Sequence, residues 1–113
     1  MHEMALCESV LQIVEEQART GGFSRVLTVR LELGALACVE PEAMRFNFEV
    51  VSQGTVAEGA ALQIDRVPAR AWCSECCQEV PVERMFAPCP RCGADLLAAM
   101  GGDEMRVKEL EVT

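Results

Sequence analysis

The sequence predicts an α+β fold: two helices packed on a small three-stranded sheet, with a four-cysteine zinc-binding module inserted between two of the strands. Three observations support this prediction. Two segments have helical apolar periodicity, three others alternate like strands, and paired Cys-x-x-Cys motifs stand between the last two strands. A length of 113 residues suits one domain that carries a small module.

The first helix is predicted from Met4 to Ala18, because apolar residues recur there with a period near 3.6. Gly21 and Gly22 are expected to end it. The expected apolar face consists of Leu6, Cys7, Val10, Leu11, Ile13, Val14 and Ala18. On this face, Cys7 is expected to act as a small buried hydrophobe.

The stretch "RVLTVRLEL" alternates strictly, which predicts a half-buried strand with an inward face of Leu27, Val29, Leu31 and Leu33. A second helix is predicted from Pro41 to Gln53, since proline suits the first helical turn. Met44, Phe48 and Val51 should share one face of that helix. The stretch "ALQIDRV" predicts a second strand with two inward residues, Leu62 and Ile64.

The last predicted strand, "EMRVKELEV", changes phase along its length. Met105 and Val107 share one face, whereas Leu110 and Val112 have the opposite phase. A bulge near Lys108 explains such a one-residue shift. Because this strand resembles the first segment in composition, we expect residues 1–67 plus 103–113 to form one domain and residues 68–102 to form the inserted module.

Composition limits the classes of function. The net charge is −8, the sequence pI is about 4.6, and no cluster of Lys and Arg is present, which disfavours binding to nucleic acid. No apolar run approaches the roughly 20 residues that span a bilayer, and no signal peptide is recognisable. We therefore expect no membrane association and a cytoplasmic location, where the seven cysteines would stay reduced and suit metal binding.

The clustered cysteines form two pairs, Cys73 with Cys76 and Cys89 with Cys92, separated by twelve residues. Two such turns supply four thiolates to one tetrahedral ion, and Gly93 helps the backbone to wrap around the sulfurs. With no open ligand position the site should be structural. Zinc is the favoured ion, although the spacing alone leaves iron in a rubredoxin-like site open.

Two other cysteines carry weaker signals. Cys77 adjoins the first pair and is a competing ligand, but the register favours Cys76. Cys38 stands before the second helix and has no interpretable pattern.

His2 is the only histidine of the chain. The α-amine of Met1, the peptide nitrogen of His2 and its imidazole can form adjacent chelate rings, with Glu3 or its backbone at a fourth position. Three coplanar nitrogens suit square-planar Ni(II) or Cu(II). The alternative is a solvated terminal histidine with no ligand role.

Together, "MHEMALCESVLQIV", "VRLELGALACVEPEAMRFNFEVVSQGTVAEGAALQID", "CSEC", "CPRCG" and "GDEMRVKELEV" make the chain resemble the HypA/HybF family over essentially its whole length. These are nickel metallochaperones of NiFe-hydrogenase maturation. The resemblance implies that Met1, His2 and Glu3 hold nickel and that the four paired cysteines hold structural zinc. It also implies a partner GTPase, HypB, and delivery of Ni(II) to the hydrogenase large-subunit precursor; some family members also serve urease.

Competing functions come from two other classes. A zinc-ribbon adaptor would make protein–protein contacts without delivering nickel. A thiol redox enzyme would use a Cys-x-x-Cys pair and contain no metal. The sequence shows no nucleophile–base pair and no Gly-rich phosphate loop, so we expect a binding and delivery protein rather than an enzyme.

Overall fold

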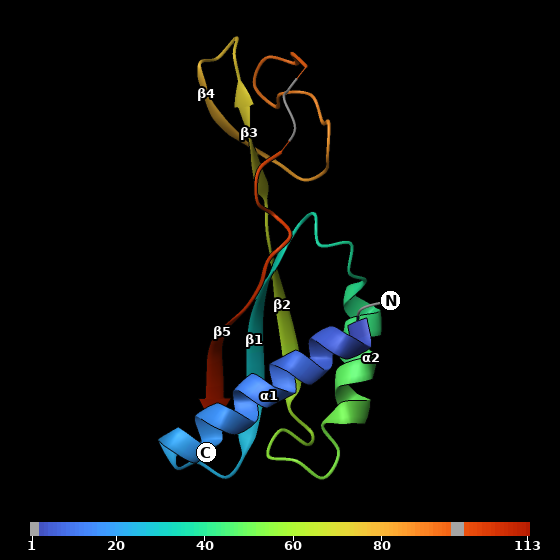
Figure 1. Cartoon of the computed structure of the whole chain (residues 1–113), viewed down its shortest axis with the longest axis vertical. Coiled ribbons are helices and arrows are strands. Elements are labelled where there is room, and N and C mark those ends of the chain that lie inside the picture. The colour runs from blue at the N-terminus through green and yellow to red at the C-terminus, as the bar shows by residue number, and fades with distance from the viewer. Residues whose placement is uncertain (1–2, 96–98) are drawn as a thin grey trace. The chain divides into compact units, whose positions relative to one another are not determined.

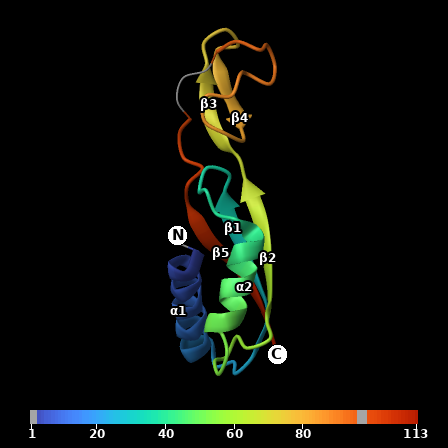
Figure 2. The ribbon, with the colours of Figure 1, turned by 90° about the vertical axis from the view of Figure 1, so that its right-hand side faces the viewer.

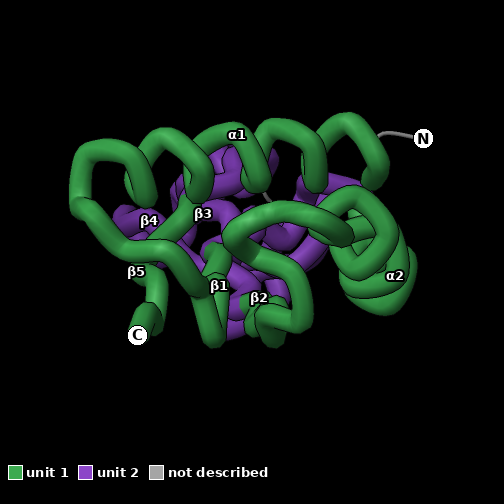
Figure 3. Tube along the Cα trace, turned by 90° about the horizontal axis from the view of Figure 1, so that it is seen from below, with its two compact units in different colours: residues 1–31, 39–64, 107–113 green, residues 32–38, 65–106 purple. Residues whose placement is uncertain are grey.

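The structure is a computed structural model, and it describes residues 3–95 and 99–113. The chain divides into two compact units (Figure 3). Unit 1 comprises Met1–Leu31, Val39–Ile64 and Val107–Thr113, and unit 2 comprises Glu32–Cys38 and Asp65–Arg106. Among the described residues, no helix is both long and apolar enough to cross a bilayer.

Both predicted helices are present in unit 1. Helix α1 spans Glu3–Gly21 and helix α2 spans Pro41–Val51. On α1, Cys7, Val10 and Val14 are fully buried, whereas Ile13 is 37% exposed, so the buried stripe is narrower than predicted. On α2, Met44 and Phe48 are buried, as the spacing indicates.

Three strands form one sheet in the order β2-β1-β5, with β1 at Val26–Gly34, β2 at Ala61–Val67 and β5 at Met105–Val112 (Figures 1 and 2). Within unit 1, α1 lies over one face of these strands (Figure 3). Helix α2 contacts β2, where Arg45 Nε donates to the Leu62 carbonyl at 3.2 Å. The predicted fold class, two helices with a small sheet, is confirmed.

The start of β1 differs from the predicted alternation. Val29, Leu31 and Leu33 are buried as expected, but Leu27 is 40% exposed and Val26 is only 1% exposed. Val26 N–H donates to the Val56 carbonyl, and the nearby Ala57 is fully buried, so the 55–60 turn covers Val26. The turn lies far away in sequence, and alternation within the strand cannot reveal it.

Side-chain contacts reveal the predicted phase change in β5. Arg106 Nε donates to Glu32 at 2.9 Å, and Arg30 Nη1 donates to Glu109 at 2.6 Å. Glu32 and Arg30 share a face of β1, yet Arg106 and Glu109 are three residues apart, which places them on opposite faces of a regular strand. One extra residue between them, a bulge, reconciles the two contacts.

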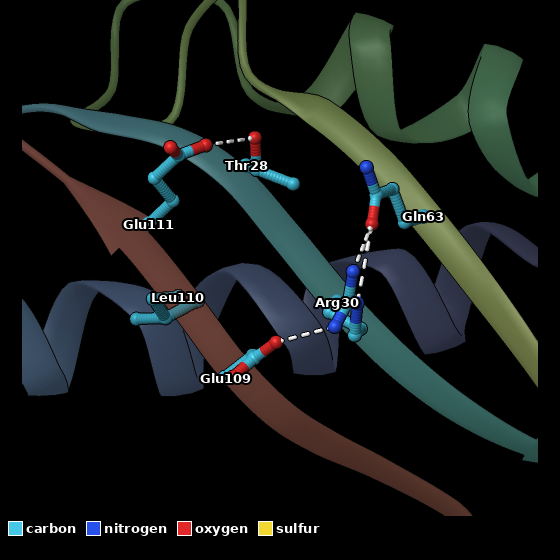
Figure 4. A pocket seen from close by; sticks show the side chains of 6 residues that line it. All are labelled: Thr28, Arg30, Gln63, Glu109, Leu110 and Glu111. Carbon is cyan, nitrogen blue, oxygen red and sulfur yellow. Dashed lines mark hydrogen bonds and ion pairs between the residues drawn. The ribbon is translucent and has the colours of Figure 1, made fainter.

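The face of the sheet that carries Arg30 is polar (Figure 4). Arg30 also donates from Nη2 to Gln63 of β2 at 2.9 Å, so its guanidinium bridges both neighbouring strands. Two residues further along each strand, on the same face, the Thr28 hydroxyl donates to the Glu111 carboxylate at 2.8 Å. Cross-strand pairs of this kind each contribute roughly 0.2–1 kcal/mol to a sheet.

Unit 2 contains a second sheet that the sequence did not predict. Strands β3, Ala69–Cys73, and β4, Gln78–Val82, pair antiparallel (Figure 2). Small residues occupy its core: Ala69, Ala71, Cys73, Val80, Val82 and Cys89. The alanines of β3 and the proline of β4 hide the strand pattern, because both residue types are depleted in strands.

A backbone crossing holds together the two segments that lead into and out of this hairpin. In unit 2, Gly34 N–H donates to the Glu104 carbonyl at 2.8 Å and Ala35 N–H to the Val67 carbonyl at 2.8 Å. A Cβ atom at Gly34 would lie 2.1 Å from the Gly102 carbonyl oxygen. The crossing therefore requires glycine at position 34.

The substitution Gly34→Ala is expected to destabilise the protein by about 3 kcal/mol, since backbone must move to admit the methyl group. Urea unfolding followed by circular dichroism measures this loss. Gly21→Ala is the matched control, because its Cβ would meet only the Phe23 ring, at 3.1 Å. Equal unfolding midpoints for the two variants would refute the steric argument.

Candidate metal sites

The four predicted cysteines converge in unit 2. Cys73 ends β3, Cys76 lies in the turn after it, and Cys89 and Cys92 belong to a second turn. Backbone N–H groups point at the sulfurs: Cys76 N–H donates to Cys73 Sγ, and Arg91 N–H donates to Cys89 Sγ, both at 3.4 Å. Such N–H···S contacts favour the thiolate form, which is the form that binds metals.

The sulfur positions fit a tetrahedral ion. The four Sγ atoms all lie within 4.8 Å of one another, with 3.6 Å between Cys73 and Cys92 and 3.9 Å between Cys76 and Cys89. Zinc–sulfur bonds of about 2.3 Å in a tetrahedron place sulfurs about 3.8 Å apart. The donor set is therefore of the right chemistry and spacing for zinc.

Charge in the cluster is divided between neighbouring thiols. A hydrogen bond with Cys92, together with desolvation, raises the pKa of Cys76 to about 12. Desolvation also opposes ionisation of Cys89, but N–H groups of Cys92 and Arg91 outweigh it and lower the pKa of Cys89 to about 6. Backbone N–H groups therefore favour the thiolate form of Cys89, whereas the hydrogen bond with Cys92 favours the form of Cys76 that keeps its proton. A bound cation would replace that proton.

Cys77 occupies a backbone position that favours glycine. Its φ is +54°, and the residue at the same place in the second turn, Gly93, has φ +77°. Cys77 is exposed, and its Sγ donates to the Ser74 carbonyl at 3.3 Å. It is not a member of the four-sulfur group, so its side chain is directed elsewhere while its backbone completes the turn.

The N-terminal candidates lie only partly within the described residues. Met1 and His2 lie outside them. Glu3 opens α1, and its Oε2 accepts from Glu40 N–H at 3.4 Å. Glu40 is the N-cap of α2, where its own carboxylate accepts from Glu42 N–H at 3.1 Å. The Glu3 carboxylate at the start of α1 therefore contacts the backbone of the residue that caps α2.

Cys7 lies one turn beyond Glu3 and is fully buried, which confirms its predicted place in the core. Its Sγ donates to the Met44 carbonyl of α2 at 3.2 Å. Burial, with a further effect of the Glu3 charge, raises the pKa of the Cys7 thiol to about 11. Cys7 thus stays protonated and links α1 to α2.

Sequence reasoning missed Glu40. Its contact with Glu3 spans 37 residues, so no local pattern reveals it. The available signal was its position before Pro41, because the residue that precedes a proline at a helix start commonly caps that helix. Cys38, also near this helix start, has φ +54° and is exposed.

Comparisons with known proteins agree with this geometry. Residues 1–112 match the family described as "Hydrogenase/urease nickel incorporation, metallochaperone, hypA". The chain is 56% identical over 112 residues to the "Hydrogenase maturation factor HypA" of Acidithiobacillus ferrooxidans and 53% identical to that of Rhodopseudomonas palustris, covering 99% of each chain.

Solved structures show the same fold. One is the "Solution structure of the Ni metallochaperone HypA from Helicobacter pylori", with a TM-score of 0.68 and 22% identity over 99% of this chain and 97% of that one. The "Solution structure of HypA protein" has a TM-score of 0.69, also at 22% identity. With full-length matches to the family and to its curated members, the chain belongs to the HypA family of nickel-incorporation metallochaperones, which are maturation factors rather than enzymes.

Proposed function

We propose that this chain binds Ni(II) at its N-terminus and delivers it, in the cytoplasm, to the large-subunit precursor of a NiFe hydrogenase. The observation that carries the proposal is the family match over residues 1–112. Its partner in delivery, as the resemblance to the family implies, is the GTPase HypB; the sequence itself shows no Gly-rich phosphate loop. Urease maturation proteins are a second class of recipient that the family description supports.

The nickel ligands in this proposal are the Met1 amine, the His2 peptide nitrogen and imidazole, and Glu3. Amine, amide and imidazole nitrogens give the planar donor set that Ni(II) favours. Glu3 starts α1 and is held near Glu40, so the residue next to the chelate is fixed by a helix rather than free. Lowering the pH protonates the amine and the imidazole, which provides a way to release the ion.

Zinc is proposed as a resident structural ion held by Cys73, Cys76, Cys89 and Cys92. The small core of unit 2 supports this assignment, because a module with so little buried apolar area depends on metal for its folding free energy. In functional terms, we assign nickel handling to residues 1–67 plus 103–113 and zinc binding to residues 68–102.

The alternative is a zinc-ribbon adaptor that contacts proteins without carrying nickel. The four-sulfur cluster suits both functions equally. The family match and the full-length relatives favour the chaperone. A nickel titration of the untagged protein separates the two functions, because an adaptor would leave the added nickel free.

Replacing His2 by Ala should abolish stoichiometric nickel binding at neutral pH while leaving the zinc content unchanged. The imidazole and the adjacent chelate ring are lost, whereas the cysteine cluster is untouched. Isothermal titration with Ni(II) and elemental analysis measure the two effects. Extending the chain ahead of Met1 is a second arm, because it removes the free amine. Equal nickel binding by wild type and both variants would contradict the terminal chelate.

Cys89→Ser should eliminate bound zinc, since a structural site needs all four thiolates. Cys77→Gly should instead retain one zinc per chain and stabilise the module by about 1 kcal/mol, because glycine accepts positive φ without steric cost. Zinc release to a chelator, followed by absorbance, reports both variants. Loss of zinc from Cys77→Gly would show that Cys77 is a ligand.

A further inference from the structure

The segment that follows β4 in unit 2 presents an aromatic side chain to solvent. We call residues 84–91, with the sequence RMFAPCPR, the tip. Phe86 is 74% exposed, more than any other large apolar side chain in the part of the chain that the structure describes, and its neighbour Met85 is 44% exposed. An aromatic ring that is so exposed contributes little to the stability of the chain through burial.

The backbone at Phe86 is also strained. Its φ is +58°, in the left-handed region that a bulky side chain rarely adopts. Fixed ends maintain this conformation: Val82 of β4 is buried before the tip, and buried Cys89 donates from its N–H to the Ala94 carbonyl at 2.9 Å. Pro88 restricts the chain between them. An outward aromatic ring held against steric strain is typical of a functional site.

The tip is a basic region of an acidic chain. It contains Arg84 and Arg91 and no carboxylate, whereas the whole chain has a net charge of −8. Both arginines are exposed, and among the described residues neither guanidinium has a hydrogen-bond or ion-pair partner. The other arginines of unit 2 all donate hydrogen bonds within that unit: Arg66, Arg70 and Arg106. The guanidinium groups of the tip are therefore available to carboxylates of another molecule.

We infer that the tip docks on a partner protein, with the Phe86 ring in an apolar pocket and with Arg84 and Arg91 on carboxylates at the rim of that pocket. Aromatic and arginine side chains are enriched among the residues that dominate the free energy of binding between proteins. Because both ends of the tip are fixed, the tip loses little conformational freedom when it binds.

Charge complementarity selects this occupant. An acidic pocket attracts the two arginines, although the rest of the chain is acidic and repels it. An anionic membrane is a poorer occupant, because its whole surface would repel the many carboxylates outside the tip.

The inference rests on the proposed function only in the choice of probe, which is the purified large-subunit precursor without nickel. Binding of the full-length, zinc-loaded chain to the immobilised precursor is measured by interferometry at several salt concentrations. Phe86→Ala should weaken binding at least about tenfold. Arg84→Glu and Arg91→Glu should each weaken binding and make the affinity less dependent on salt.

The variant Phe86→Gly separates a binding role from a structural one. Glycine accepts a φ of +58° without steric cost, so the urea midpoint of this variant should be at least as high as that of the wild type. The same variant should bind the precursor as weakly as Phe86→Ala does. A lower midpoint together with unchanged binding would show that Phe86 serves stability and would overturn the inference.

Phe46→Ala and Arg19→Glu are the matched controls in unit 1. The first removes a ring that is 66% exposed, and the second reverses the charge of an exposed arginine. Both should bind the precursor as wild type does. Equal affinities of wild type and Phe86→Ala would overturn the inference, and so would a wild type that does not bind the precursor.

Two further measurements separate the alternatives. Co-sedimentation of the wild type, but not of Phe86→Ala, with phosphatidylglycerol vesicles would assign the tip to a lipid surface and overturn docking on a protein. Nickel titration of Phe86→Ala should still show binding at the N-terminus, because the tip contributes no proposed nickel ligand. Docking through the tip by a chain that binds no nickel would contradict the proposed function alone.

Discussion

The metal-binding module depends on a backbone crossing within unit 2. The turn after β1 donates hydrogen bonds both to the segment that leads into the hairpin, at Val67, and to the segment that returns from it, at Glu104 and Gly102. The contact is so close that no side chain fits at Gly34. Because the buried residues of the module are alanines, valines and cysteines, apolar packing contributes little to its register. Backbone hydrogen bonds and the cysteine cluster must fix that register instead.

Local rules recovered most of the fold. Helical periodicity located α1 and α2, and alternation located β1 and β2, because the neighbours of each residue within one element determine those patterns. The spacing of the Cys-x-x-Cys pairs led to four sulfurs that converge on one point, since each turn is a local structure. The phase of β5 gave even its bulge, which the contacts of Arg106 and Glu109 reveal.

Features that depend on distant parts of the chain escaped prediction. Val26 is buried by the turn that follows α2, and the Glu3 carboxylate accepts a hydrogen bond from the Glu40 backbone N–H. The β3–β4 hairpin escaped for a different reason, since its core alternates Ala69 and Ala71 with exposed residues and alanine carries little strand signal. For Cys77 the register correctly favoured Cys76 as the member of the four-sulfur group, but the spacing did not show that the Cys77 backbone has a positive φ.

The charged side chains of β5 form ion pairs with β1 that are individually weak. Arg30 with Glu109 is a largely exposed pair, and such pairs contribute only about 0.2–1 kcal/mol to stability. The charges of β5 change sign along the strand, from Arg106 and Lys108 to Glu109 and Glu111. Those of β1 change sign in the matching order, so that Arg106 pairs with Glu32 and Glu109 pairs with Arg30. Opposite charges across the two strands favour this antiparallel register over a shifted one, so the pairs act more on the register than on the stability of the sheet.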